Sequence, residues 1–235
     1  MNFLKISCFF IVFFIVSCNP IEMGNEQHFS GILSIVVNEN GIKTIENKFS
    51  TFTVQDLGLD TIPEETCGLA SFVVDFDNQP EKTPPFDAKL LSWEKLGTST
   101  FRIQGEITDA YEDTLYSASF DQNLRHFIFL IVNHQKMLKD DIYRYELLCC
   151  KDSVDVKGIM TMYLKTKHDT QGIDTVPMNR SFLIAFNIRT LWNEQTAQGN
   201  DTLKFNLKYS NRTDSIGNII YSSYGKNPVK LPLIP

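Results

Sequence analysis

The sequence predicts an all-β protein, because apolar residues recur at every second position through most of the chain. In the run 203–209, apolar residues alternate with polar ones, as expected for a strand with one buried face. The same alternation recurs in 72–76, 101–107 and 182–188. Clusters of Asn, Asp, Gly and Pro separate these runs and are typical of turns. Strands that follow one another without intervening amphipathic helices favour an all-β architecture.

The first element of the chain is a removable signal, predicted over residues 1–17. Lys5 precedes an apolar run from Ile6 to Val16. This run is about half of the roughly 20 residues that a membrane-spanning helix needs. A basic residue before a short apolar run is typical of a secretory signal peptide. We therefore expect the protein to be exported.

The end of this signal, Ile15-Val16-Ser17-Cys18, resembles the lipobox of bacterial lipoproteins. The resemblance implies cleavage before Cys18, a diacylglyceryl group on its sulfur, and an acyl chain such as palmitate on the new amino group. Two or more chains hold a protein stably at a membrane, whereas one binds only marginally. In such lipoproteins an aspartate after the cysteine favours the inner membrane, and this chain has Asn19. An ordinary signal with a chance cysteine is the alternative.

The rest of the chain divides into a tether and two domains. Residues 18–27 are polar without alternation, which predicts a short tether. The turn-rich segment 96–100 is the best domain boundary after the tether. It leaves residues 28–99 for a small β-barrel and residues 100–235 for an antiparallel β-sandwich.

Two segments of the second domain depart from simple alternation. Phe127 to Val132 is apolar at every position, which predicts a central strand covered on both faces. Thr190 to Gln198 is the one plausible helix, and we expect Gly199 to end it.

The charge balance argues against one class of partner. Of the 22 Lys and Arg residues, Lys5 lies in the signal, which leaves 21 basic against 28 acidic residues and a net charge of −7. Such a surface repels a phosphate backbone, so nucleic-acid binding is not expected.

Cys67, Cys149 and Cys150 are the cysteines that come after Cys18. An oxidising compartment permits disulfides, so Cys67 can pair with either of the other two, and the sequence leaves that choice open. Buried thiols are the simpler interpretation, because free cysteine packs as a small hydrophobe. The adjacent pair lacks the C-x₂₋₄-C spacing of zinc sites, so no metal or other cofactor is expected.

The sequence contains no G-x-S-x-G, H-E-x-x-H, P-loop or G-x-G-x-x-G motif. His168-Asp169 can supply half of an acid–base pair, which makes a hydrolase using His168 and a nearby acid one alternative. A solvated loop is the simpler interpretation, and the adjacent acids Asp140-Asp141 are likewise interpreted as a solvated turn.

Aromatic side chains are the other candidate binding groups, because they can stack on sugar rings. At strand spacing they more often belong to the core, since each buries a large apolar area. The candidates are Trp93, Trp192, Tyr143, Tyr145, Tyr221 and Tyr224.

Several stretches carry a family resemblance: Ser30-Gly31-Ile32 through Phe49-Ser50-Thr51-Phe52, Leu69 to Phe76, Ala88 to Trp93, and Met162 to Lys165 through His168-Asp169 to 181–188. Together with the lipobox, their order resembles the NigD-like lipoproteins of Bacteroidetes. The resemblance implies an OB-like barrel followed by a C-terminal β-sandwich over the whole mature chain. The family takes its name from a bacteriocin gene cluster, which implies an immunity or protection role as an alternative function.

The sequence therefore predicts a lipid-anchored outer-membrane protein that acts as a non-enzymatic binding module for a protein or a small ligand. Its expected partners are the membrane, through the lipid at Cys18, and an envelope protein or glycan. Glu22 and Glu26 are spaced apart, so they do not choose between the periplasmic and the cell-surface side. No binding residues and no oligomeric state can be derived from the sequence.

Overall fold

The computed structural model describes residues 26–37, 43–54, 62–63, 66–104, 113–138, 141–150, 154–170 and 176–233. Cys18 and the predicted signal 1–17 lie outside these residues, so lipidation at Cys18 stays a prediction. Among the described residues, no helix combines the length and the apolar character needed to cross a membrane.

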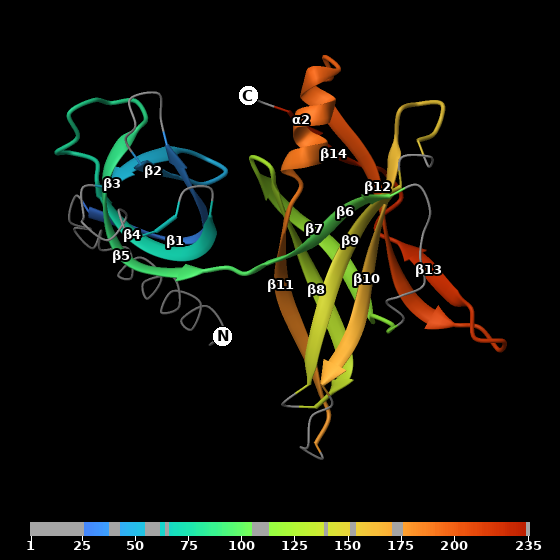
Figure 1. Ribbon diagram of the computed structural model, residues 1–235. Coiled ribbons are helices and arrows are strands. Elements are labelled where there is room, and N and C mark those ends of the chain that lie inside the picture. Colours follow the sequence, from blue (N-terminus) through green and yellow to red (C-terminus); the bar gives the residue numbers. More distant parts are fainter. Residues whose placement is uncertain are drawn as a thin grey trace, which may run out of the picture.

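Five strands form a closed barrel at the N-terminal side of the chain (Figure 1). They are β1 (Glu26–Val37), β2 (Lys43–Glu46), β3 (Thr51–Val54), β4 (Cys67–Asp75) and β5 (Phe86–Lys95). Around the barrel their order is β1-β2-β3-β5-β4, and β3 pairs with β5 in parallel. This is the order of an OB-fold barrel, so the predicted OB-like domain is confirmed. Glu26 and Gln27, placed in the tether 18–27 by the sequence, belong instead to β1 and pair with β4.

Alternate apolar residues fill the barrel. The buried set includes Leu33, Ile35, Ile45, Phe52, Phe72 and Val74. On β4, Gly68 allows a close approach to β5. A Cβ at this position would lie 2.6 Å from the carbonyl oxygen of Glu94 and 2.6 Å from a ring carbon of Trp93. Gly68 therefore lets the Trp93 ring lie close to β4.

Nine strands form a second, curled sheet (Figure 1). They are β6 (Thr98–Gln104), β7 (Ser117–Leu124), β8 (Phe127–Met137), β9 (Ile142–Cys150), β10 (Met160–Thr170), β11 (Met178–Asn187), β12 (Thr202–Thr213), β13 (Ile219–Ser223) and β14 (Val229–Pro232). Their order is β13-β12-β10-β9-β6-β11-β8-β7, with β14 paired to β12. Phe120 of β7 packs edge-on against Phe205 of β12, with ring centroids 6.3 Å apart. The sheet thus folds over its own core, and the predicted all-β class with a barrel followed by a larger β domain is confirmed.

The strand pairing corrects one detail of the prediction. The sequence predicts an antiparallel sandwich, but β6 pairs in parallel with both β9 and β11, and β10 pairs in parallel with β12. Strand β6 comes directly from the barrel and inserts between two strands that appear later in the chain. The alternation of apolar and polar residues identifies a strand but does not show whether its neighbours run parallel or antiparallel to it. The parallel pairing therefore cannot be predicted from the local sequence.

One helix, α2 (Arg189–Ala197), comes after β11 and covers one end of the second domain (Figure 1). Leu191 and Trp192 face the core, where they join buried residues of the sheet such as Leu147 and Phe186. The helix matches the predicted segment 190–198.

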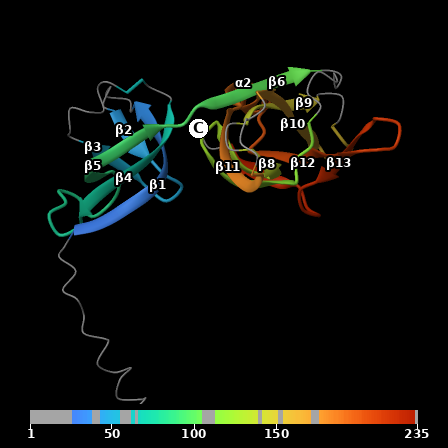
Figure 2. The same ribbon diagram turned by 90° about the horizontal axis from the view of Figure 1, so that it is seen from below.

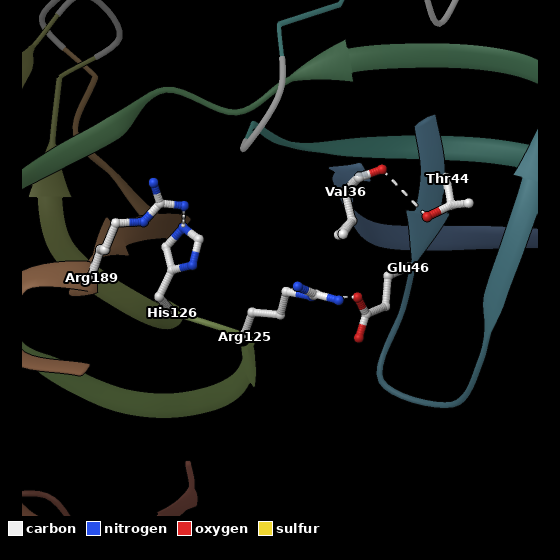
Figure 3. Close-up of polar contacts among 6 residues, drawn as sticks. All are labelled: Val36, Thr44, Glu46, Arg125, His126 and Arg189. Carbon is white, nitrogen blue, oxygen red and sulfur yellow. Dashed lines mark hydrogen bonds and ion pairs between the residues drawn. The ribbon is translucent and has the colours of Figure 1, made fainter. Parts of the chain in front are cut away.

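The two domains meet through an apolar cluster and an ion pair. Residues of the cluster are Ile32, Cys67 and Leu96 on the barrel side, and Leu124, Phe127, Phe129, Leu183 and Ala185 on the sheet side. Beside the cluster, Arg125 Nε lies 2.6 Å from Glu46 Oε2, and Arg189 donates a hydrogen bond of 3.2 Å to His126 Nε2 (Figure 3). Strand β5 runs into β6 across the same junction (Figure 2). Burial of apolar side chains from both domains favours a fixed arrangement of the pair.

Candidate functional site

A cluster of rings lies near the ends of β8, β9, β10 and β11, at the end of the sheet opposite α2 (Figure 1). We call His134, Tyr143, Tyr145, His168 and Phe182 the ring cluster. Tyr143 stacks on His168 with centroids 4.7 Å apart and lies 4.2 Å from His134. His134 Nε2 and the Tyr145 hydroxyl share a hydrogen bond of 2.8 Å. Phe182 packs edge-on against His134.

His168 does lie beside a carboxylate, but the partner is Asp141. His168 Nε2 donates to Asp141 Oδ1 at 3.0 Å. Asp141 Oδ2 accepts the backbone N–H of Leu138 at 2.6 Å, which closes the turn between β8 and β9. Asp141 is 9% exposed, so the interpretation of this acid as a solvated turn is wrong. Asp169, the neighbour of His168 in the sequence, pairs instead with Arg144 at 2.7 Å.

Burial shifts the pKa of His134 and of Tyr143 in the ring cluster. It lowers the pKa of His134 from 6.5, an effect that His168 reinforces and that Asp113 and Asp141 oppose. Burial also raises the pKa of the Tyr143 hydroxyl, with a further contribution from Asp141. His134 therefore favours its neutral form, and the hydrogen bonds of the cluster orient rings and close a turn. No Ser, Thr or Cys side chain hydrogen-bonds either imidazole of the cluster within the described part of the chain.

The cavities lined by described residues include three of about 270 Å³ or more, and neither His168 nor Asp141 lines any of these three. One of about 440 Å³ lies on the barrel between Glu26, Asp75 and Asp87. Another of about 270 Å³ lies at the domain junction, lined by Phe49 of the barrel and Gln122 of β7. The third, of about 400 Å³, lies beside α2. We call the third one the α2 cavity.

The wall of the α2 cavity is built from the last turn of the helix. Asn200 N–H donates to the Gln195 carbonyl at 3.1 Å, and Gly199 N–H donates to the Thr196 carbonyl at 2.9 Å. This pair of bonds is a Schellman motif, and Gly199 takes the left-handed φ of +78° that the motif requires. Backbone geometry therefore fixes Gln195, Gln198 and Asn200 relative to one another.

The side chains of these three residues form an amide chain. Gln195 is 8% exposed, and its Oε1 accepts a hydrogen bond from Asn200 Nδ2 at 2.9 Å. Gln195 Nε2 donates to Gln198 Oε1 at 3.4 Å. The buried Gln195 thus holds the two more exposed amides in place. Lys157, from the segment between β9 and β10, and Lys204 of β12 also line this cavity.

The residues singled out in the sequence fall mostly into the core. Trp93 packs against the barrel core, and Trp192, Tyr143, Tyr145 and Tyr224 belong to or pack against the core of the second domain. Tyr221 packs edge-on against Tyr163. These positions use the aromatic rings for packing.

The cysteines Cys67, Cys149 and Cys150 are buried thiols, and no disulfide joins them in the described structure. Burial raises the pKa of the Cys67 thiol to about 11, as expected for a cysteine within the apolar domain junction. Over the described residues, no group of three His, Cys, Asp or Glu side chains has the arrangement of a metal site.

Sequence reasoning missed Gln195, Gln198 and Asn200. Their signal is local: three amide side chains bracket a glycine at the predicted end of a helix. Amide side chains are also common at solvated helix ends that have no binding role. Only the burial of Gln195 and the adjoining cavity distinguish this helix end from those.

Comparison with solved structures finds the same architecture in several proteins. An uncharacterized protein from Parabacteroides merdae matches with a TM-score of 0.69 at 15% identity, over 88% of this chain and 100% of its own. A candidate lipoprotein from Bacteroides fragilis matches with a TM-score of 0.58 at 14% identity, over 88% and 99% of the two chains. A NigD-like immunity protein from Bacteroides caccae matches with a TM-score of 0.55 at 16% identity, over 87% and 97%.

These similarities span both domains of the chain. No protein-family profile and no curated protein matches the sequence. At these identities the structural likeness concerns the fold. The fold expected from the NigD-like resemblance is confirmed: the chain has the two-domain β architecture of the NigD-like immunity protein from Bacteroides caccae.

Proposed function

We propose that this protein is a lipid-anchored outer-membrane protein of the NigD-like kind that acts as a non-enzymatic binding module. The lipobox-like end of the signal at Cys18 supports the anchor. The shared fold with a candidate lipoprotein from Bacteroides fragilis supports an envelope location. The lipid keeps the barrel near the bilayer, which raises the effective concentration of any partner in the envelope.

The α2 cavity is the observation that carries the binding role. Its volume of about 400 Å³ is in the range of small-ligand sites. Its amide wall is held by a helix-ending backbone motif and by the buried Gln195, so the polar groups are in place before a ligand arrives. Preorganised polar groups lower the entropic cost of binding.

The ring cluster supports the choice of binding over hydrolysis. Both carboxylate oxygens of Asp141 already accept hydrogen bonds, one from the turn that it closes and one from His168. These bonds give Asp141 and His168 a structural role, and neither residue lines the barrel cavity, the junction cavity or the α2 cavity. We therefore place function at the α2 cavity.

Hydrogen exchange tests this proposal. The full chain, purified in detergent, is compared with and without a low-molecular-mass fraction of envelope extract. We expect slower exchange in 154–160 and 189–204, which border the α2 cavity, and unchanged exchange in 141–146 of the ring cluster. Protection that is confined to the ring cluster, or no protection anywhere, contradicts a binding role at the α2 cavity.

An immunity role is a second candidate, favoured by the structural likeness to the NigD-like immunity protein of Bacteroides caccae. Cells that lack the gene should then die when exposed to bacteriocin-containing supernatants of related strains, and the wild-type gene should restore survival. Equal survival with and without the gene contradicts this role and leaves the binding proposal in place.

A further inference from the structure

We propose that the α2 cavity binds an N-acetylated sugar acid, that is, a small sugar that carries both an acetamido group and a carboxylate. This inference rests on the proposed function and names the ligand class of the same site. It is based on the charge of the cavity, the free ends of its amide side chains and its apolar floor.

The charge of the cavity is opposite to that of the protein. The chain after residue 17 carries a net charge of −7, yet the α2 cavity has two ammonium groups, Lys157 and Lys204, against the carboxylate of Glu194. A locally positive cavity on a negative protein selects anions. A carboxylate accepts charge-assisted hydrogen bonds from lysine, which are stronger than bonds between neutral groups.

The amide wall leaves both donors and acceptors for a ligand. Gln198 uses its Oε1 to accept from Gln195, so its NH₂ group remains as a donor. Asn200 uses its Nδ2 to donate to Gln195, so its Oδ1 remains as an acceptor. An acetamido group presents the complementary pair, a C=O that accepts and an N–H that donates.

The apolar part of the lining suits the rest of such a ligand. Leu191, Met160 and Val154 line the cavity together with the polar groups, and they can contact the methyl of an acetamido group. Thr202 adds a hydroxyl for the sugar hydroxyls. A peptide with a free carboxyl terminus also combines an amide and a carboxylate, but it lacks the hydroxyls that Thr202 can meet.

Calorimetric titration of the full chain in detergent tests the ligand class with probes that vary one group at a time. N-Acetylneuraminic acid and N-acetylmuramic acid carry both groups, N-acetylglucosamine lacks the carboxylate, and glucuronic acid lacks the acetamido group. We expect the first two to bind at least about tenfold more tightly than N-acetylglucosamine, because a hydrogen bond to a charged group contributes that much. We also expect them to bind more tightly than glucuronic acid, which lacks the hydrogen bonds of the neutral acetamido group. Equal binding of all four, or binding of an N-acetyl dipeptide alone, overturns the proposal.

Matched variants locate the binding. Gln198→Glu keeps the oxygen that accepts from Gln195 but removes the outward donor, so we expect loss of the preference for N-acetylglucosamine over glucose. Uncharged sugars are compared for this variant, because the new carboxylate also repels carboxylated probes. Lys157→Ala with Lys204→Ala should abolish the preference for carboxylated probes, whereas Lys82→Ala on the barrel should change neither. The double lysine variant can also lower the melting temperature without changing the affinity for carboxylated probes. In that case the lysines only stabilise the fold near the end of α2, and the proposed ligand class is wrong.

The two proposals can fail separately. If envelope extract protects the α2 cavity from exchange but none of the four sugars binds, the ligand class is overturned and the binding role stands. If neither the extract nor any sugar has an effect, both are overturned.

Discussion

Arg125 of the turn between β7 and β8 and Glu46 of β2 link the two domains, with Arg125 Nε 2.6 Å from Glu46 Oε2 (Figure 3). Arg125 takes a left-handed φ of +50°, which residues with a side chain adopt at an energetic cost. The same turn carries His126, which accepts a hydrogen bond from Arg189. The conformation of this turn thus places the side chains of Arg125 and His126 at the domain junction.

We predict a small coupling between Arg125 and Glu46. The side chains are 45% and 23% exposed, so solvent screens the pair and we expect a coupling of about 0.5–1 kcal/mol. A double-mutant cycle of Arg125→Ala and Glu46→Gln, read by urea unfolding, measures it. A coupling near zero would mean that this ion pair adds nothing to the contact made by the apolar cluster.

Gly68→Ala should destabilise the barrel by about 1–3 kcal/mol, because the new methyl group overpacks the interior. The methyl would lie 2.6 Å from the Glu94 carbonyl oxygen, which is backbone and cannot move aside easily. Gly97→Ala is the control, since nothing lies within 4 Å of a Cβ there. Equal unfolding midpoints for the two variants would contradict the close approach of β4 and β5 at Gly68.

Acid should destabilise the protein through His134. Its pKa is lower in the folded state than the ordinary 6.5, so the unfolded state binds more protons as the pH falls. The contribution of His134 to the free energy of unfolding is therefore fully present above about pH 6.5 and decreases as the pH falls below this value. For one group the decrease is no more than about 1.4 kcal/mol per pH unit. His134→Phe should flatten this part of the stability–pH profile, which urea unfolding at several pH values measures. A profile of the variant parallel to wild type would assign the effect to other groups.

Gly199→Ala should cost about 1–2 kcal/mol, the penalty for a side chain in the left-handed conformation. No atom lies within 4 Å of the added Cβ, so the cost comes from the backbone alone. Gly199→Asn should cost less, because asparagine tolerates this conformation. Thermal unfolding ranks the three proteins, and equal melting temperatures would argue against the Schellman motif.

Local patterns predict much of this fold. The run 203–209 lies within β12, and the apolar stretch Phe127 to Val132 lies within β8, with its first four residues buried. Gly199 comes after α2 as expected, because a helix end needs a conformation that glycine supplies locally. The position of β6 between β9 and β11 depends on packing between distant segments, so no local pattern reports it.

In the candidate site, too, some features have a local sequence pattern and others depend on contacts between distant segments. The pairing of His168 with Asp141 joins residues from the end of β10 and the β8–β9 turn, and only the register of the strands brings them together. Gln195, Gln198 and Asn200 lie close in sequence, but their role depends on a cavity that Lys157 and Lys204 complete from other segments. The resemblance to NigD-like lipoproteins indicated the architecture and carried no information on this cavity.

Metabolic labelling with a palmitate analogue tests most directly whether Cys18 carries the lipid that we propose holds this binding module at the membrane. Wild-type protein and Cys18→Ala are expressed in parallel in a Bacteroidetes host, and Cys67→Ala serves as the control for a cysteine elsewhere in the chain. We predict label on the wild type and on Cys67→Ala, and no label on Cys18→Ala, which should accumulate as the uncleaved precursor. Equal labelling of wild type and Cys18→Ala would contradict the lipid anchor and with it the idea of a tethered module.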